Sequence, residues 1–146
     1  MRNWLPGVRD ERGSASEEAA VGVPAFVLFV GLIIFGGRTA TTHEAVESAA
    51  ADAARSASIA RTSPEAQHDA KTAARASLAN QQIHCLRVDV SIDTSDFTTP
   101  VGEPGTVAAT VQCRLDLSDL SVPGVPGSRV IKATMSSPLD TWRERR

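Results

Sequence analysis

Few residues of this chain have the types and spacing that chemistry requires. Two acids, Glu17 and Glu18, directly precede a run of 19 uncharged residues, 19–37. A carboxylate at the edge of so apolar a stretch is costly unless it finds a cationic partner. Two cysteines, Cys85 and Cys113, follow far along the chain and are able to form one disulfide. The chemistry to consider is therefore the pairing of a carboxylate and the oxidation of two thiols.

Other residues offer no catalytic or metal-binding pattern. The three histidines, His43, His68 and His84, are scattered without the spacing of zinc ligands, and we interpret them as surface residues. The chain has no CxxC, P-loop, GxGxxG or GxSxG motif. A net charge of -2 and the absence of tyrosine argue against nucleic-acid binding. We expect no enzyme, no cofactor and no metal site.

The run from Ala19 to Gly37 organises the rest of the chain. As a helix it spans about 28 Å, close to the bilayer hydrocarbon thickness of about 30 Å. It lacks a polar stripe, and a chain of 146 residues is too small to bury such a helix in its own core. A signal peptide would have a shorter apolar stretch and basic residues before it. The run predicts a membrane-spanning helix, with a removable signal or a buried soluble helix as the alternatives.

The stretch GSASEE at residues 13–18 resembles the processing site of type IV pilin-like precursors. In those precursors a basic leader ends in glycine, the cut follows that glycine, and glutamate is the fifth residue of the product; Gly13 and Glu18 fit this spacing. More closely, the chain is similar to actinobacterial TadE-like minor pseudopilins of the tight adherence (Tad) pilus. Their RGSA-type start precedes a membrane helix, an alanine-rich stem and a small exported β-rich domain with paired cysteines. The ending SPLDTWRER, residues 137–145, is also similar to family members.

The resemblance implies cleavage after Gly13 by a prepilin peptidase, and assembly with other pilin-like subunits on an inner-membrane platform. A glycine before the cut bond has no side chain, so the backbone can enter a narrow protease site. Cleavage would leave an amine on Ser14, and the resemblance implies that Glu18 pairs with such an amine of a neighbouring subunit. Glu17 is the rival carboxylate, and simple capping of the helix by both acids is the alternative. Major pilins often carry tyrosine where this chain has Ala19, which favours a minor subunit.

The charges that flank the run predict its orientation. Arg2, Arg9 and Arg12 precede it, and by the positive-inside rule they keep the N-terminus in the cytoplasm, although Arg38 on the far side weakens the bias. Export of the remaining chain favours a disulfide over two unpaired buried thiols. We expect a single-pass protein of the cell membrane, in contact with the lipid bilayer, whose C-terminal domain is extracytoplasmic.

Beyond Arg38 the high alanine content predicts two helices. A seam of small residues spaced by four and three predicts that the membrane helix continues as a stem against which another backbone packs closely. The seam consists of Val46, Ala50, Ala53, Ala57 and Ala60. The sequence TSPE at residues 62–65 is a helix-start signal, so a second helix should run from about Pro64 to about Gln81.

The apolar period then changes from near 3.6 to 2. Alternation over residues 83–93 and 106–117 predicts two half-buried strands, and a third should run from Arg129 to Ser136. A three-stranded antiparallel sheet with one apolar face needs a cover, and the second helix is the nearest candidate.

The two cysteines present a conflict within this pattern. A hairpin centred on Thr99 would place them near one another. Simple alternation, however, puts Cys85 on the polar face and Cys113 on the apolar one. A bulge or an offset pairing would resolve the conflict.

We therefore predict an α+β protein with a long N-terminal transmembrane helix, an alanine-rich stem, a second helix and a three-stranded antiparallel sheet. Its parts are a leader peptide (1–13), the transmembrane helix (14–38), the stem with the second helix (39–81) and a small β-rich domain (82–146). The expected function is that of a minor pseudopilin of a Tad-type pilus or secretion apparatus. An unprocessed anchor that displays a small binding domain is the alternative. A small secreted enzyme is a third and poorer one, because no catalytic constellation supports it.

Overall fold

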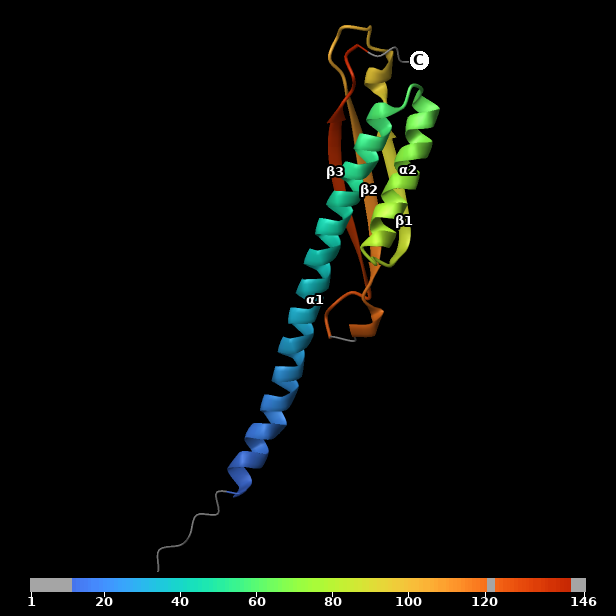
Figure 1. Ribbon diagram of the computed structural model, residues 1–146. Helices are drawn as coiled ribbons and strands as arrows, with labels where there is room; N and C mark the ends of the chain where they lie inside the picture. The colour runs from blue at the N-terminus through green and yellow to red at the C-terminus, as the bar shows by residue number, and fades with distance from the viewer. Residues whose placement is uncertain (1–11, 121–122, 143–146) are drawn as a thin grey trace, which may run out of the picture.

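The computed structural model describes residues 12–120 and 123–142, with side chains from residue 19 onward. Within those ranges it contains two α-helices and three β-strands, in the chain order α1, α2, β1, β2, β3. Short 3-10 turns, η1 (Ser95–Thr98) and η2 (Ser118–Leu120), follow β1 and β2. Figure 1 shows α1 extending far beyond one end of the part formed by α2 and the sheet. The predicted α+β class and its elements are confirmed.

Helix α1 (Arg12–Ile59) is a single helix of 48 residues, about 72 Å long. It continues through Pro24 without ending. The prediction that the apolar helix extends into an alanine-rich stem is therefore confirmed, and one rigid element carries both the uncharged run and the seam.

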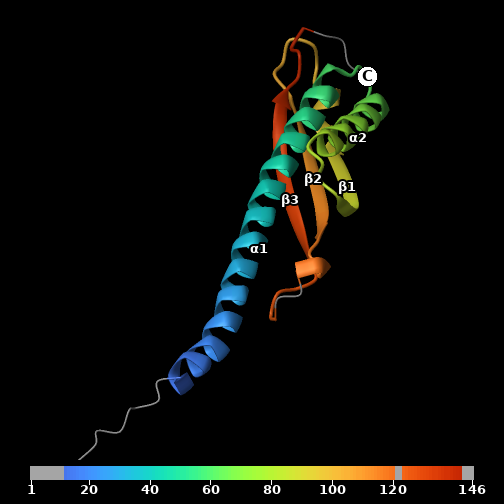
Figure 2. The ribbon, with the colours of Figure 1, turned by 60° about the horizontal axis from the view of Figure 1, so that its bottom comes forward.

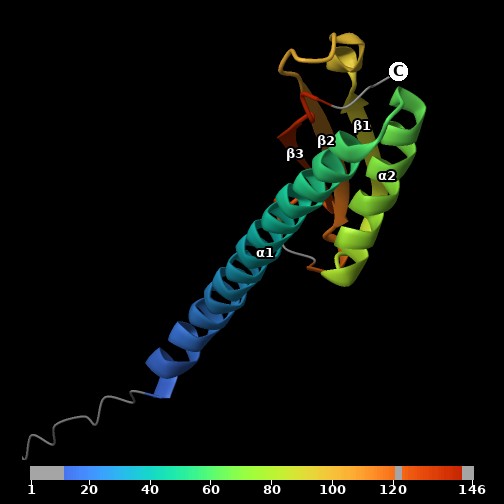
Figure 3. The ribbon, with the colours of Figure 1, turned by 45° about the horizontal axis from the view of Figure 1, so that its top comes forward.

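Helix α2 (Ser63–Asn80) starts and ends one residue earlier than predicted. Thr62 caps it, because its hydroxyl oxygen accepts a hydrogen bond from the backbone N–H of Glu65 at 3.3 Å. The Glu65 carboxylate in turn accepts one from the backbone N–H of Arg61 at 3.0 Å. These bonds satisfy donors at the helix start while the chain reverses direction between α1 and α2 (Figure 3).

The sheet has three antiparallel strands in the order β1-β2-β3. They are β1 (Cys85–Asp93), β2 (Thr106–Asp116) and β3 (Ser128–Pro138). The alternation predicted for the second strand is confirmed, since every second residue from Val107 to Leu117 is buried. On β3, Ile131 and Ala133 face inward while Val130 is half exposed, which decides a facing that the sequence left open.

Both helices cover the same face of the sheet and divide it between them (Figure 2). The stem half of α1 packs against β2 and β3, and α2 packs against β1. The sequence pointed to the second helix as the cover, and that prediction was incomplete. The seam of α1 is wide enough to contact α2 and the sheet at once, so the stem covers the larger share.

The core is built largely from alanine. The predicted seam on α1 is buried along its whole length, and its largest member, Val46, has no exposed surface. Helix α2 contributes Ala66, Ala70 and Ala74, all fully buried. Strand β2 supplies larger side chains such as Val107. Because the helix side chains are so small, the two helix backbones and the sheet can approach one another closely.

Candidate functional site

The first half of α1 contains the uncharged run 19–37 and presents large apolar side chains on all its sides. Val21 is 74% exposed, Phe26 66% and Ile33 58%. No part of its most apolar stretch is buried within the fold. Among the described residues, α1 is the one helix long and apolar enough to cross a membrane. The long exposed helix fits a membrane anchor.

The predicted cleavage site and register residue stand at the very start of α1. The helix begins at Arg12, so the backbone at Gly13, Ser14 and Glu18 is helical. The side chains of residues 12–18, with Glu18 and its rival Glu17 among them, lie outside the described residues, as does the remainder of the predicted leader, 1–11. The roles assigned to these residues therefore stay predictions.

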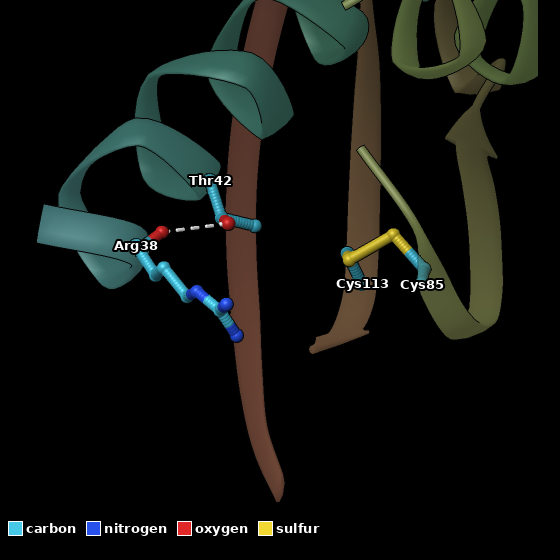
Figure 4. The surroundings of a disulfide bond; sticks show 4 residues. All are labelled: Arg38, Thr42, Cys85 and Cys113. Carbon is cyan, nitrogen blue, oxygen red and sulfur yellow. Dashed lines mark hydrogen bonds between the residues drawn. A yellow bond between two sulfur atoms is a disulfide. The ribbon is translucent and has the colours of Figure 1, made fainter. Parts of the chain in front are cut away.

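Three threonines that follow the run form side-chain hydrogen bonds within α1. The hydroxyls of Thr39, Thr41 and Thr42 each donate to the carbonyl oxygen four residues earlier, at 2.9, 3.0 and 2.8 Å. Thr42 is almost fully buried, and its bond to the Arg38 carbonyl lies beside the end of the sheet that carries the cysteines (Figure 4). A buried hydroxyl without a partner would be costly. These bonds let the helix leave the apolar run and enter the protein core.

Arg38, the first charged residue after the run, reaches across to Asp119 in η2. Its Nη1 atom lies 2.8 Å from Oδ2 and 2.9 Å from Oδ1 of that carboxylate. The two residues are 81 positions apart, and no sequence pattern pairs them. Their side chains are 45% and 60% exposed, so the pair contributes only about 0.2–1 kcal/mol. Its importance is positional, because it holds the turn after β2 against α1.

A disulfide joins Cys85 to Cys113, whose Cα atoms are 5.4 Å apart (Figure 4). Cys113 is fully buried on β2, as the alternation predicted. The facing conflict of Cys85 is resolved by a bulge, because the β1–β2 register shifts between Cys85 and Arg87. The irregularity turns Leu86 outward, where it is 59% exposed, and leaves Cys85 packed against the core.

The other titratable residues that the structure describes lie apart from one another or in local contacts. Over the described ranges, no three His, Cys, Asp or Glu side chains gather where they could hold a metal ion. His43 contacts Glu47 at 3.2 Å on the exposed side of the stem. Asp93 and Asp116 share one local arrangement: each carboxylate accepts a hydrogen bond from the backbone N–H of the serine two residues later. That bond does most to lower the pKa of each carboxyl below its usual value. They shape turns at strand ends.

A comparison with family models finds one match, to a family described as TadE-like protein, over residues 13–55. The match starts at Gly13, crosses the exposed half of α1 and ends in the stem. Residues 13–55 are similar to the TadE-like family. The resemblance inferred from the sequence is thereby confirmed over these residues, and the match is consistent with a TadE-like protein of the Tad pilus system. Comparisons with curated proteins and with solved structures find no match.

The loop after β2 borders the apolar helix, a contact that the sequence did not predict. The loop after β2 lies beside the middle of α1 in Figures 1 and 2, and Gly31 of α1 lines a groove together with Leu120 and Pro123 of the loop. A signal was present in the sequence. Between Asp119 and Arg129 no residue is charged, so this loop is a second, short uncharged stretch.

Proposed function

We propose that this chain is a minor pseudopilin, an assembly protein of a Tad-type pilus or secretion apparatus. The observation that carries the proposal is the family match over residues 13–55, which begins at Gly13, the residue before the predicted cut. The exposed apolar half of α1 supports it, since a helix that assembles within a membrane must be apolar on every side.

In the proposed topology the N-terminus is cytoplasmic and the sheet domain is extracytoplasmic. Arg2, Arg9 and Arg12 precede the run, and the positive-inside rule favours this orientation. The disulfide supports it too, because disulfides persist in oxidising compartments and are rare in the cytosol.

The proposed mechanism is lateral packing of α1 beside other pilin-like helices in the membrane. A prepilin peptidase cuts after Gly13 and leaves an amine on Ser14. Glu18 then pairs with the amine of a neighbouring subunit and sets the register, because an unpaired carboxylate at the membrane edge is costly. The partners are the peptidase, other pilin-like subunits and the inner-membrane platform of the apparatus.

The cut is tested by the intact mass of the mature chain from a host that carries the matching peptidase. We expect a chain that starts at Ser14. Gly13→Leu is the companion variant, because its side chain should keep the backbone out of a narrow protease site and leave the full-length chain. A full-length wild-type chain from the same host contradicts the processing step.

The register is tested by Glu18→Ala, with Glu17→Ala as the matched control. We expect E18A to be cut and to form its disulfide, yet to lose co-purification with sibling subunits, while E17A keeps it. The opposite result assigns the register to Glu17. Normal assembly by both variants removes the register mechanism.

The alternative function is an unprocessed anchor that displays a small binding domain. The specific observation in its favour is the open face of the sheet, where Arg87 and Asp89 form an exposed ion pair at 2.8 Å and Thr110 bonds Thr134 at 2.8 Å. A chain that keeps Met1 in a host with active peptidase favours this alternative.

A further inference from the structure

The loop between β2 and β3 is closed at its base, and its described residues lie beside α1 (Figure 1). The backbone N–H of Leu117 donates to the Gly127 carbonyl oxygen at 2.9 Å, which closes the loop. From residue 120 to 128 the sequence has no charge. Leu120 packs partly against the core, and Pro123 lines a groove against α1. The loop therefore presents apolar groups beside the exposed half of the helix.

The groove lies beside a part of α1 that a bilayer has to contain. Its wall on α1 consists of Val23, Pro24, Val27, Leu28, Val30, Gly31 and Ile34. The uncharged run 19–37 spans about 28 Å, so a hydrocarbon core of about 30 Å takes up all of it. Gly31 comes seven residues before Arg38, about 10 Å along the helix axis. A loop that lines this groove reaches below the level at which the run ends.

The ion pair between Arg38 and Asp119 marks that level. Charged groups belong at the headgroups rather than in the hydrocarbon. Arg38 is the charge that ends the uncharged run, and Asp119 is the charge that precedes the uncharged part of the loop. Because the two side chains are in contact, both uncharged segments start at one height and extend toward the same side.

Two features of the loop reduce the number of backbone N–H groups that hydrocarbon would leave unpaired. An unpaired backbone N–H is costly there, since no water is present to bond it. Pro123 and Pro126 have no N–H to expose. The N–H of Leu120 is satisfied by the Leu117 carbonyl oxygen at 3.2 Å.

We propose that this loop is a second membrane contact: Leu120 and Pro123 insert into the leaflet on the side of the sheet domain, and a lipid acyl chain fills the groove between loop and helix. The insertion is shallow, about 5–10 Å, as for other interfacial elements. The two contacts restrict how the sheet domain tilts about α1. The inference rests on the membrane-spanning helix of the proposed function, but not on cleavage or on pilus assembly.

The test is quenching of tryptophan fluorescence in phosphatidylcholine vesicles whose acyl chains carry bromine. The full chain is used after Trp4 and Trp142 are replaced by phenylalanine, so that each variant has one tryptophan. Pro123→Trp and, as a second reporter, Val125→Trp report on the loop. Val27→Trp reports on the helix, and Val101→Trp is the control, because Val101 is 54% exposed in the loop at the opposite end of the sheet.

We expect V27W, P123W and V125W to lose most of their emission in brominated lipid, with emission at shorter wavelength than V101W, which stays unquenched. Quenching of V27W alone overturns the loop insertion while the anchor stands. An unquenched V27W overturns the anchor and the loop insertion together. Blue-shifted loop reporters that bromine does not quench also overturn the proposal, because protein rather than lipid would then fill the groove.

Discussion

Helix α1 has two halves with different surroundings, the apolar half up to Gly37 and the stem half from Arg38 onward. The apolar side chains of the two halves differ in size. In the first half of α1 the apolar side chains are large and exposed, and Phe26 is 66% exposed. In the stem half they are small and buried, and Ala53 has no exposed surface. The backbone is continuous between them. Both halves are helical, so helical propensity does not distinguish them. They differ in what surrounds their side chains.

The difference in side-chain size follows from how lipid and protein each pack against a helix. Lipid tails are fluid and fill any shape, so a helix among them needs apolar groups on every side and gains little from close fit. A protein partner is rigid, so the stem needs one apolar face with side chains small enough for backbones to approach. Asp52 and Arg55 are accordingly exposed on the other side of the stem.

The largest effect is expected from removal of the disulfide, which acts on the sheet domain and not on the apolar half. Cys85 and Cys113 are separated by 28 positions, and closure of such a loop contributes about 3–4 kcal/mol. The variant with both Cys85→Ala and Cys113→Ala should lose that amount in urea unfolding of the full chain in detergent micelles. The helical circular dichroism of the apolar half should persist at the urea concentration where the sheet unfolds. An unchanged unfolding midpoint contradicts the prediction.

A pair of identical substitutions compares the two halves directly. Ala53→Leu places a larger side chain in the closed seam and should cost about 1–3 kcal/mol of the free energy of unfolding. Ala25→Leu makes the same change at an exposed position of the apolar half and should stay within about 0.5 kcal/mol of the wild type. The same urea experiment measures both. Equal costs would mean that the stem is not closely packed.

A smaller effect is expected at the border between the halves. In a double-mutant cycle, Arg38→Gln with Asp119→Asn should give a coupling energy of about 0.2–1 kcal/mol that declines in added salt. Arg87→Gln with Asp89→Asn is the control cycle, since that pair is also exposed but lies away from α1. A coupling at Arg38 well above this range would show that the membrane border strengthens the pair.

The smallest effect concerns pH and the turn that leads into the loop. The backbone N–H and then the hydroxyl of Ser118 bond the Asp116 carboxylate, at 3.0 and 2.7 Å, and hold its pKa below the ordinary 3.8. A lowered folded-state pKa stabilises the fold above the unfolded-state value and loses that contribution as pH falls through the folded-state value. Asp116→Asn should therefore be slightly less stable than the wild type at neutral pH, and the difference should vanish in acid. Urea midpoints measured across the acid range check this, and a difference that persists at low pH contradicts it.

Most elements of this fold can be predicted from local sequence patterns. The uncharged run, the TSPE start of α2 and the alternation of β2 each act within a few neighbouring residues, so their patterns predict conformation well. The similarity to the TadE-like family that begins at Gly13 was also readable from the sequence, because the motif that carries it lies in consecutive residues. The roles of Ser14 and Glu18 follow from that motif and remain predictions.

How these elements pack against one another could not be predicted from the sequence and is seen in the folded chain. Folding placed Arg38 against Asp119, 81 positions away, and brought the loop with Pro123 beside the apolar half of α1. It also inserted the bulge that turns Cys85 inward. A sequence period describes which face of an element is apolar, but not which partner covers that face or where a strand takes up an extra residue. The packing partner and the strand register depend on contacts among segments that are far apart in the sequence. A pattern of neighbouring residues therefore does not predict them.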